Sequence, residues 1–86
     1  MEEIVEAGGK NYKIRELTLE EGMISSAVDD PKQATYEFVS KCLVEPTLSA
    51  EEIKKLPFRE GLKLVQAVQL LNGLSKDFTK PKEASN

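Results

Sequence analysis

The sequence contains no histidine and only one cysteine, Cys42. A single cysteine cannot form an internal disulfide, and with no histidine to join it, it cannot make a metal site. Because Cys42 falls on the apolar stripe of a predicted helix rather than beside a base, we expect it to be a packing residue. A lone cysteine also fits a reducing compartment. The sequence therefore predicts a protein that is not an enzyme and needs no cofactor or metal.

Long apolar runs are also lacking, as is a basic and apolar N-terminal segment. No stretch approaches the roughly 20 apolar residues that a membrane helix needs, and the start MEEIVEAGGK has no secretory signal pattern. The 15 acidic and 12 basic residues give a net charge of -3, which opposes non-specific attraction to a phosphate backbone. We therefore expect a cytoplasmic protein that has neither a membrane nor a nucleic acid as its partner.

The chain of 86 residues suits one small globular domain, which we place at residues 1–74. The remaining segment, 75–86, is polar and contains proline, so we expect a flexible tail. A domain of this size buries only about 60% of the surface that its unfolded chain exposes. It would gain stability from association, either with another protein or with further copies of itself in a homo-oligomer.

A β-hairpin is predicted over residues 2–15, because Gly8 and Gly9 suit a tight turn between β-forming residues. A two-residue loop at these glycines fixes the cross-strand pairs, which are Glu2–Arg15, Glu3–Ile14, Ile4–Lys13 and Val5–Tyr12. One face of this hairpin then carries Val5, Tyr12 and Ile14. That face needs a covering helix, since an isolated hairpin is barely stable in water.

Helices are expected after the hairpin, at about residues 19–28, 31–44, 50–55 and 58–72. Pro46 and Pro57 end the helices before them, because proline lacks an N–H and clashes inside a helix. Gly73 is placed to end the last helix in a left-handed conformation. The predicted fold class is mainly α (α+β), with an N-terminal β-hairpin followed by about four helices in a small bundle.

The starts of the first three helices carry capping signals, which are the Thr18/Glu21 and Ser49/Glu52 capping boxes and the Asp30-Pro31 pair. Acidic pairs at these starts could in principle bind a metal or act as acid and base. They are Glu20-Glu21, Asp29-Asp30 and Glu51-Glu52. We favour capping as their function, because carboxylates at helix starts satisfy free N–H groups and match the helix dipole.

Two further patterns have both a functional and a structural interpretation. The segment 8–10, GGK, superficially resembles a phosphate loop, but it lacks the full spacing and a following helix, so we favour a hairpin turn. Lys55, Arg59 and Lys63 recur every four residues, although Pro57 interrupts the helix after the first of them. We favour a solvated basic face. A nucleic-acid binder that uses these three residues stays as an alternative.

Apolar side chains cover more than half of the circumference of the predicted helix 58–72, and Leu19, Met23 and Ile24 lie on one face of the predicted helix 19–28. For the last helix, a buried central position and a face offered to a partner helix are both open interpretations. In the second, the open apolar face covers an apolar segment of another chain and keeps it soluble. On this reasoning the candidate partner-binding residues are Met23, Leu64, Val68 and Leu71.

Three segments together resemble the tail assembly chaperones of long-tailed phages. They are YKIRELT at 12–18, CLVEPTLSAEEIKKLP at 42–57 and GLKLVQAVQLLNGL at 61–74. The similarity runs from the second strand of the hairpin to Gly73. The similarity lies in the predicted architecture and in the general pattern of residues, and it involves no catalytic motif.

The resemblance implies a function in the cytoplasm of an infected or lysogenic host cell. Such a chaperone keeps the helix-rich tape measure protein soluble and helps tail tube subunits assemble around it, without ATP. Members of the family are often made in two lengths by ribosomal frameshifting, and the short form would end in a polar tail like 75–86. The alternative is a small regulatory or adaptor domain that binds a helix unrelated to phage tails.

Overall fold

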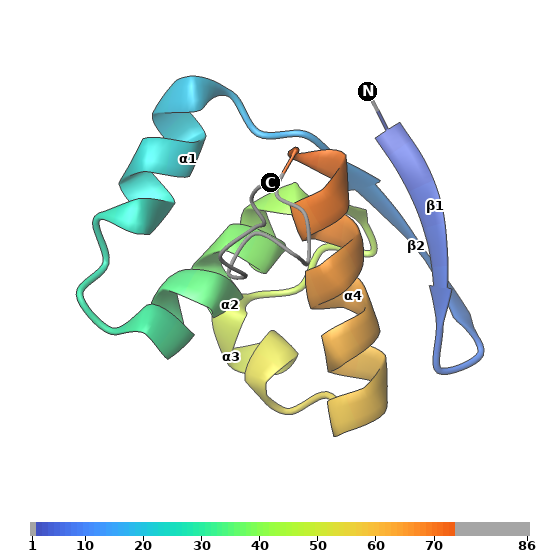
Figure 1. The fold of residues 1–86 in the computed structure, drawn as a ribbon. Coiled ribbons are helices and arrows are strands. Elements are labelled where there is room, and N and C mark those ends of the chain that lie inside the picture. Colours follow the sequence, from blue (N-terminus) through green and yellow to red (C-terminus); the bar gives the residue numbers. More distant parts are fainter. Residues whose placement is uncertain (1, 74–86) are drawn as a thin grey trace, which may run out of the picture.

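The computed structural model describes residues 2–73. Its elements are β1 (Glu2–Ala7), β2 (Lys10–Arg15), α1 (Leu19–Ser26), α2 (Pro31–Cys42), β3 (Leu43–Glu45), α3 (Ala50–Lys54) and α4 (Phe58–Leu71) (Figure 1). The predicted α+β class is confirmed at the level of an N-terminal hairpin followed by helices. The predicted flexible tail, 75–86, lies outside the described residues.

The hairpin has the predicted register. Val5 faces Tyr12, Glu3 faces Ile14, and the other predicted pairs also align. Gly8 and Gly9 have φ angles of 61° and 77°, which a residue with a side chain adopts only at a cost. The turn therefore depends on the two glycines.

The predicted helix starts are confirmed, whereas some predicted ends are not. Thr18 Oγ1 accepts a hydrogen bond from the Glu21 N–H at 3.2 Å, and Glu21 Oε1 accepts one from the Thr18 N–H at 2.9 Å. The second capping box, Ser49 with Glu52, and the Asp30 N-cap are also present. The first helix ends at Ser26, two residues before the predicted end.

The end of the second helix was predicted wrongly. A helix over 31–44 was expected, but α2 ends at Cys42 and the next three residues form β3, which pairs antiparallel with β2 through Ile14 opposite Leu43. Pro46 disfavours helical geometry at the residue before it, so the chain is extended there. The sheet order is therefore β1-β2-β3, with β2 in the centre and β1 at one edge.

The core lies between the sheet and the helices α2 and α4. Its fully buried side chains come from β2, α2 and α4, and the largest are Tyr12, Ile14, Val39, Cys42, Leu64 and Val68. Helix α4 lies beside the hairpin and contacts both of its strands. It is the covering helix that the hairpin was predicted to need.

A buried polar pair joins the hairpin to α4. The Tyr12 hydroxyl donates a hydrogen bond of 2.5 Å to Glu60 Oε2, and the Glu60 side chain lies under the turn at Gly8. The pKa of Tyr12 is raised to about 12, mainly by burial and to a smaller extent by the hydrogen bond to Glu60 and by the charge of Glu60. The phenol thus stays protonated at neutral pH and keeps donating to the carboxylate.

A bidentate ion pair joins the end of β2 to the start of α1. Arg15 Nη1 and Nη2 donate to the two carboxylate oxygens of Glu21, at 2.9 and 3.0 Å. The same carboxylate accepts from the Thr18 N–H. The Arg15 hydrogen bonds, then the backbone bond at Thr18, lower the pKa of Glu21 to about 2.

This pair predicts a loss of stability in acid. The unfolded carboxyl has a pKa of about 4.3, so the unfolded chain binds more protons than the folded one below that pH. The contribution of Glu21 should be nearly complete at pH 5 and above, and it should be lost as the pH falls towards 2, the pKa of Glu21 in the fold. Urea unfolding of the protein at pH 5 and pH 2.5 measures this loss.

Glu21→Gln keeps a side chain that can close the capping box but removes the charge. It should therefore show a smaller drop in the free energy of unfolding between the two pH values than the unchanged protein. Glu20→Gln, a charge change in the same turn, is the control and should leave the drop unchanged. Equal drops in the two variants would contradict the assignment.

Candidate functional site

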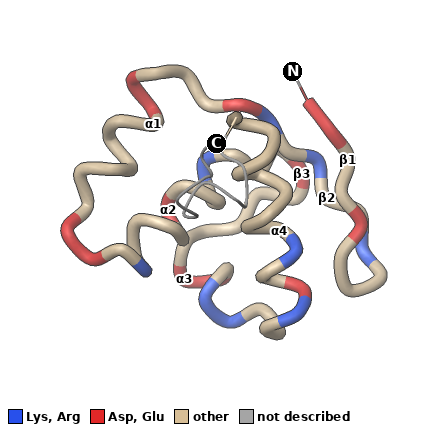
Figure 2. The backbone as a smooth tube through the Cα atoms, viewed as in Figure 1, with Lys and Arg blue, Asp and Glu red and all other residues tan. Residues whose placement is uncertain are grey.

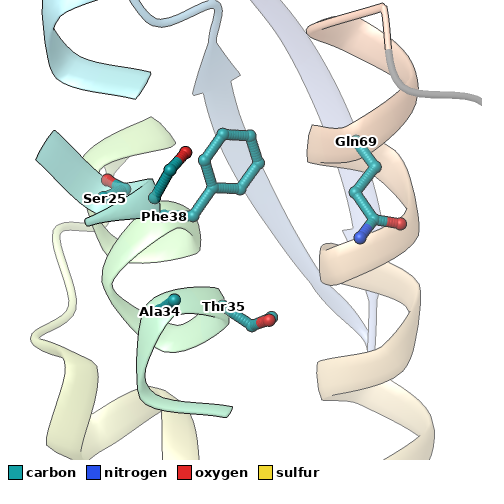
Figure 3. A pocket seen from close by; sticks show the side chains of 6 residues that line it. Ser25, Ala34, Thr35, Phe38 and Gln69 are labelled. Carbon is teal, nitrogen blue, oxygen red and sulfur yellow. The ribbon is translucent and has the colours of Figure 1, made fainter. Parts of the chain in front are cut away.

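Two adjoining hollows separate α1 from the C-terminal end of α4. The larger, of about 370 Å³, and the smaller, of about 190 Å³, share Ser26 and Phe38 in their walls. We call this continuous surface the α1 groove. Its walls include Leu17, Leu19, Met23, Ser25, Gln69 and Asn72. In Figure 3, side chains of α1 and α2 stand on one side of the smaller hollow and Gln69 of α4 on the other.

Helix α1 turns apolar side chains towards solvent. Leu19 is 81% exposed, Met23 63% and Ile24 55%, although the three share one helix face. Ser25 is the residue of α1 that is buried. Helix α1 packs against α2 and lies apart from α4 in Figure 1. A helix with this exposure lacks the cover that apolar helix faces normally have.

Ser25 is a buried polar residue in the wall of the smaller hollow, which is also lined by the polar residues Ser26, Thr35 and Gln69. Ser25 is 3% exposed, and within residues 2–73 its hydroxyl has no hydrogen-bond partner. A buried hydroxyl without a partner is unfavourable by about 1–3 kcal/mol. Most of the surface that lines both hollows is nevertheless apolar, which suits an occupant that is mainly apolar.

Asn72 fixes the floor of the α1 groove at the end of α4. Its Oδ1 accepts from the Leu17 N–H at 2.7 Å, and its Nδ2 donates to the Val68 carbonyl at 2.7 Å and to Cys42 Sγ at 3.6 Å. It therefore links α4 to α2 and to the segment before α1. Sequence reasoning missed this residue. An asparagine directly before the helix-ending Gly73, which has a φ of 83°, was the available signal.

The four candidate partner-binding residues differ in how exposed they are, and they do not form one surface. Met23 lies exposed in the α1 groove, and Leu71 is partly buried against the core. Leu64 and Val68 are both 0% exposed, so their prediction as partner-binding residues is corrected. The apolar circumference of α4 is used to cover β1, β2 and α2, and these two side chains belong to that packing. Exposed apolar positions of α4 are instead Phe58, Leu62 and Leu70.

The cysteine and the acidic pairs have structural roles. Burial raises the pKa of Cys42 to about 11, so its thiol remains protonated at neutral pH and is a poor nucleophile. Glu21, Asp30 and Glu52 cap helices, as predicted. Across residues 2–73 no group of three or more Cys, Asp or Glu side chains is arranged to hold a metal ion.

Within the same residues, no helix has the length and apolar character needed to cross a membrane. No family model matches the chain, and neither a curated protein nor a solved structure is similar to it.

Proposed function

We propose that this protein is a tail assembly chaperone of a long-tailed phage, and that it binds apolar helix surfaces of the tape measure protein in the α1 groove. The observation that carries the proposal is the solvent exposure of Leu19, Met23 and Ile24 on one helix beside an open apolar hollow. The sequence resemblance described above supplies the class of partner. The function requires neither catalysis nor a cofactor.

Binding would replace water on two apolar surfaces at once. Full burial of a leucine- or methionine-sized side chain contributes about 1.5–3 kcal/mol, so a few such contacts give useful affinity after the loss of freedom on association is subtracted. An amphipathic helix presents side chains at the spacing that such a groove accepts. A long helix-rich protein offers this face repeatedly, so several chaperone molecules can cover it in the host cytoplasm until tail tube subunits assemble.

Co-expression with a tape measure protein tests this proposal. The chaperone is expected to raise the soluble fraction of the tape measure protein, and Leu19→Ser or Met23→Ser should each weaken binding about tenfold, which is about 1.4 kcal/mol. Pull-down and titration calorimetry measure the interaction. Ile4→Ser is the matched control, because Ile4 is 64% exposed on the other face of the hairpin.

A tape measure protein that stays equally insoluble with and without this chain would overturn the proposal. The adaptor alternative predicts instead a gene located away from tail genes and no effect on tape measure solubility. A slippery heptamer near the stop codon, followed by a very long helical reading frame, would favour the chaperone.

A further inference from the structure

A second apolar surface lies at the opposite end of α4, between α3 and the first turns of α4. It surrounds a hollow of about 180 Å³ whose walls include Tyr36, Ile53, Lys54, Leu56, Phe58 and Leu62. We call this the α3–α4 surface. Phe58 is 82% exposed and Leu62 42%, and their spacing of four residues places them on one face of α4. The 14 residues of α4 put roughly 20 Å between this surface and the α1 groove.

The exposed charge around the α3–α4 surface is mixed, with an excess of basic residues. Helix α3 carries two exposed acidic residues, Glu51 and Glu52. The segment from Lys54 to Lys63 carries four basic side chains, Lys54, Lys55, Arg59 and Lys63, and all four are exposed. Its single carboxylate, Glu60, is buried and accepts the hydrogen bond from Tyr12. Figure 2 shows basic residues around the end of α3 and the first part of α4, with acidic residues on both helices among them, and it shows acidic residues near the two ends of α1.

An ion pair reduces the positive charge at Lys54, and the uncapped start of α4 adds to the positive charge beside Phe58. Lys54 Nζ lies 3.1 Å from Glu51 Oε2, in an ion pair exposed to solvent, and 6.0 Å from the centre of the Tyr36 ring. Such exposed pairs are weak, so the lysine can turn to another carboxylate. At the start of α4, Pro57 provides no side-chain cap, which leaves the positive end of the helix dipole beside Phe58.

We propose that the α3–α4 surface is a second docking site, which binds an acidic amphipathic helix of a different protein. The exposed Phe58 and Leu62 would contact the apolar stripe of that helix, and the surrounding cations would pair with carboxylates beside the stripe. A protein is favoured over a nucleic acid because the walls of the hollow are mainly apolar, with more aliphatic than aromatic side chains, and the whole chain has a net charge of -3. This site is separate from the one proposed for the tape measure protein.

The test uses the full chain and two synthetic 18-residue helical peptides. Both have leucine at positions 1, 4, 5, 8, 11, 12 and 15, and all other positions are glutamate in one peptide and lysine in the other. Fluorescence anisotropy gives the affinities, and amide NMR shifts locate the bound peptide. The acidic peptide should bind at least tenfold more tightly than the basic one, weaken as salt rises, and shift amides around Phe58 and Leu62.

Substitutions in the α3–α4 surface should reduce that affinity. Phe58→Ser and Lys63→Glu are each expected to weaken binding of the acidic peptide at least tenfold. Leu70→Ser, on the exposed face near the other end of α4, and Lys10→Glu, on the hairpin, are matched controls that should change it less than twofold. Circular dichroism of each variant verifies that the fold is retained. Met23→Ser should also leave this binding unchanged, which separates the test from that of the chaperone function.

Four outcomes would overturn the inference. The first is equal affinity for the two peptides, and the second is a set of shifted amides in the α1 groove. The third is binding of a 20-nucleotide single-stranded DNA that Lys63→Glu abolishes, because this would assign the surface to nucleic acid. The fourth is self-association that Phe58→Ser abolishes, because the occupant would then be a second copy of this chain and not a different protein.

Discussion

Gly8→Ala is expected to lower the free energy of unfolding by about 2–4 kcal/mol, whereas Gly9→Ala should lower it by only about 1–2 kcal/mol. Both glycines have positive φ angles, so both alanines are strained. A side-chain carbon at Gly8 would also overlap Glu60 Oε1, whereas one at Gly9 has open space around it. The glutamate can swing away only by breaking its bond to Tyr12, which leaves a buried hydroxyl without its acceptor.

Urea unfolding of the two alanine variants measures the difference. Tyr12→Phe in both backgrounds provides a double-mutant cycle, because the extra effect of Gly8→Ala should shrink once the hydroxyl is removed. Equal losses for the two glycine variants would show that the position of Glu60 under the turn does not contribute to stability.

Leu64→Ala is expected to lower the free energy of unfolding by about 2–5 kcal/mol, because it removes a fully buried side chain and leaves a cavity. Leu70→Ala is the matched control on the same helix. Leu70 is 55% exposed, so its truncation should change stability by no more than about 1 kcal/mol. Denaturant titration of both variants gives the comparison.

The Leu64 result also decides between two interpretations of α4. A small loss for Leu64→Ala would mean that the side chain is accessible, and it would restore Leu64 as a candidate partner contact. A large loss identifies it as part of the core, as its exposure of 0% indicates. Weakened partner binding in that variant would then reflect loss of the fold.

The features that sequence reasoning predicted correctly depend on neighbours a few residues apart. The hairpin register follows from a two-residue turn, and the capping boxes follow from residues three positions apart. The ends of elements were less predictable. Residues 43–45 leave α2 because the distant strand β2 offers them a pairing edge, and no local pattern specifies that pairing.

The sequence pattern also could not predict which apolar positions of the helices are exposed to solvent. Leu64 and Leu70 are chemically identical residues on one helix, yet their exposed fractions are 0% and 55%. What separates them is which side of α4 faces the sheet, and this depends on packing between segments far apart in the chain. The same holds for α1, whose apolar face fits a core helix by its pattern but lies in solvent.

Strand β1 also bears on whether copies of the protein aggregate through their sheets. As the edge of the sheet, β1 presents backbone N–H and C=O groups that another β-strand could pair with, which is a common route to aggregation. Its exposed carboxylates belong to Glu2, Glu3 and Glu6. A second copy docking there would bring like charges together. At the opposite edge, β3 is three residues long and is followed by Pro46. Strand addition is thus disfavoured at both edges of the sheet.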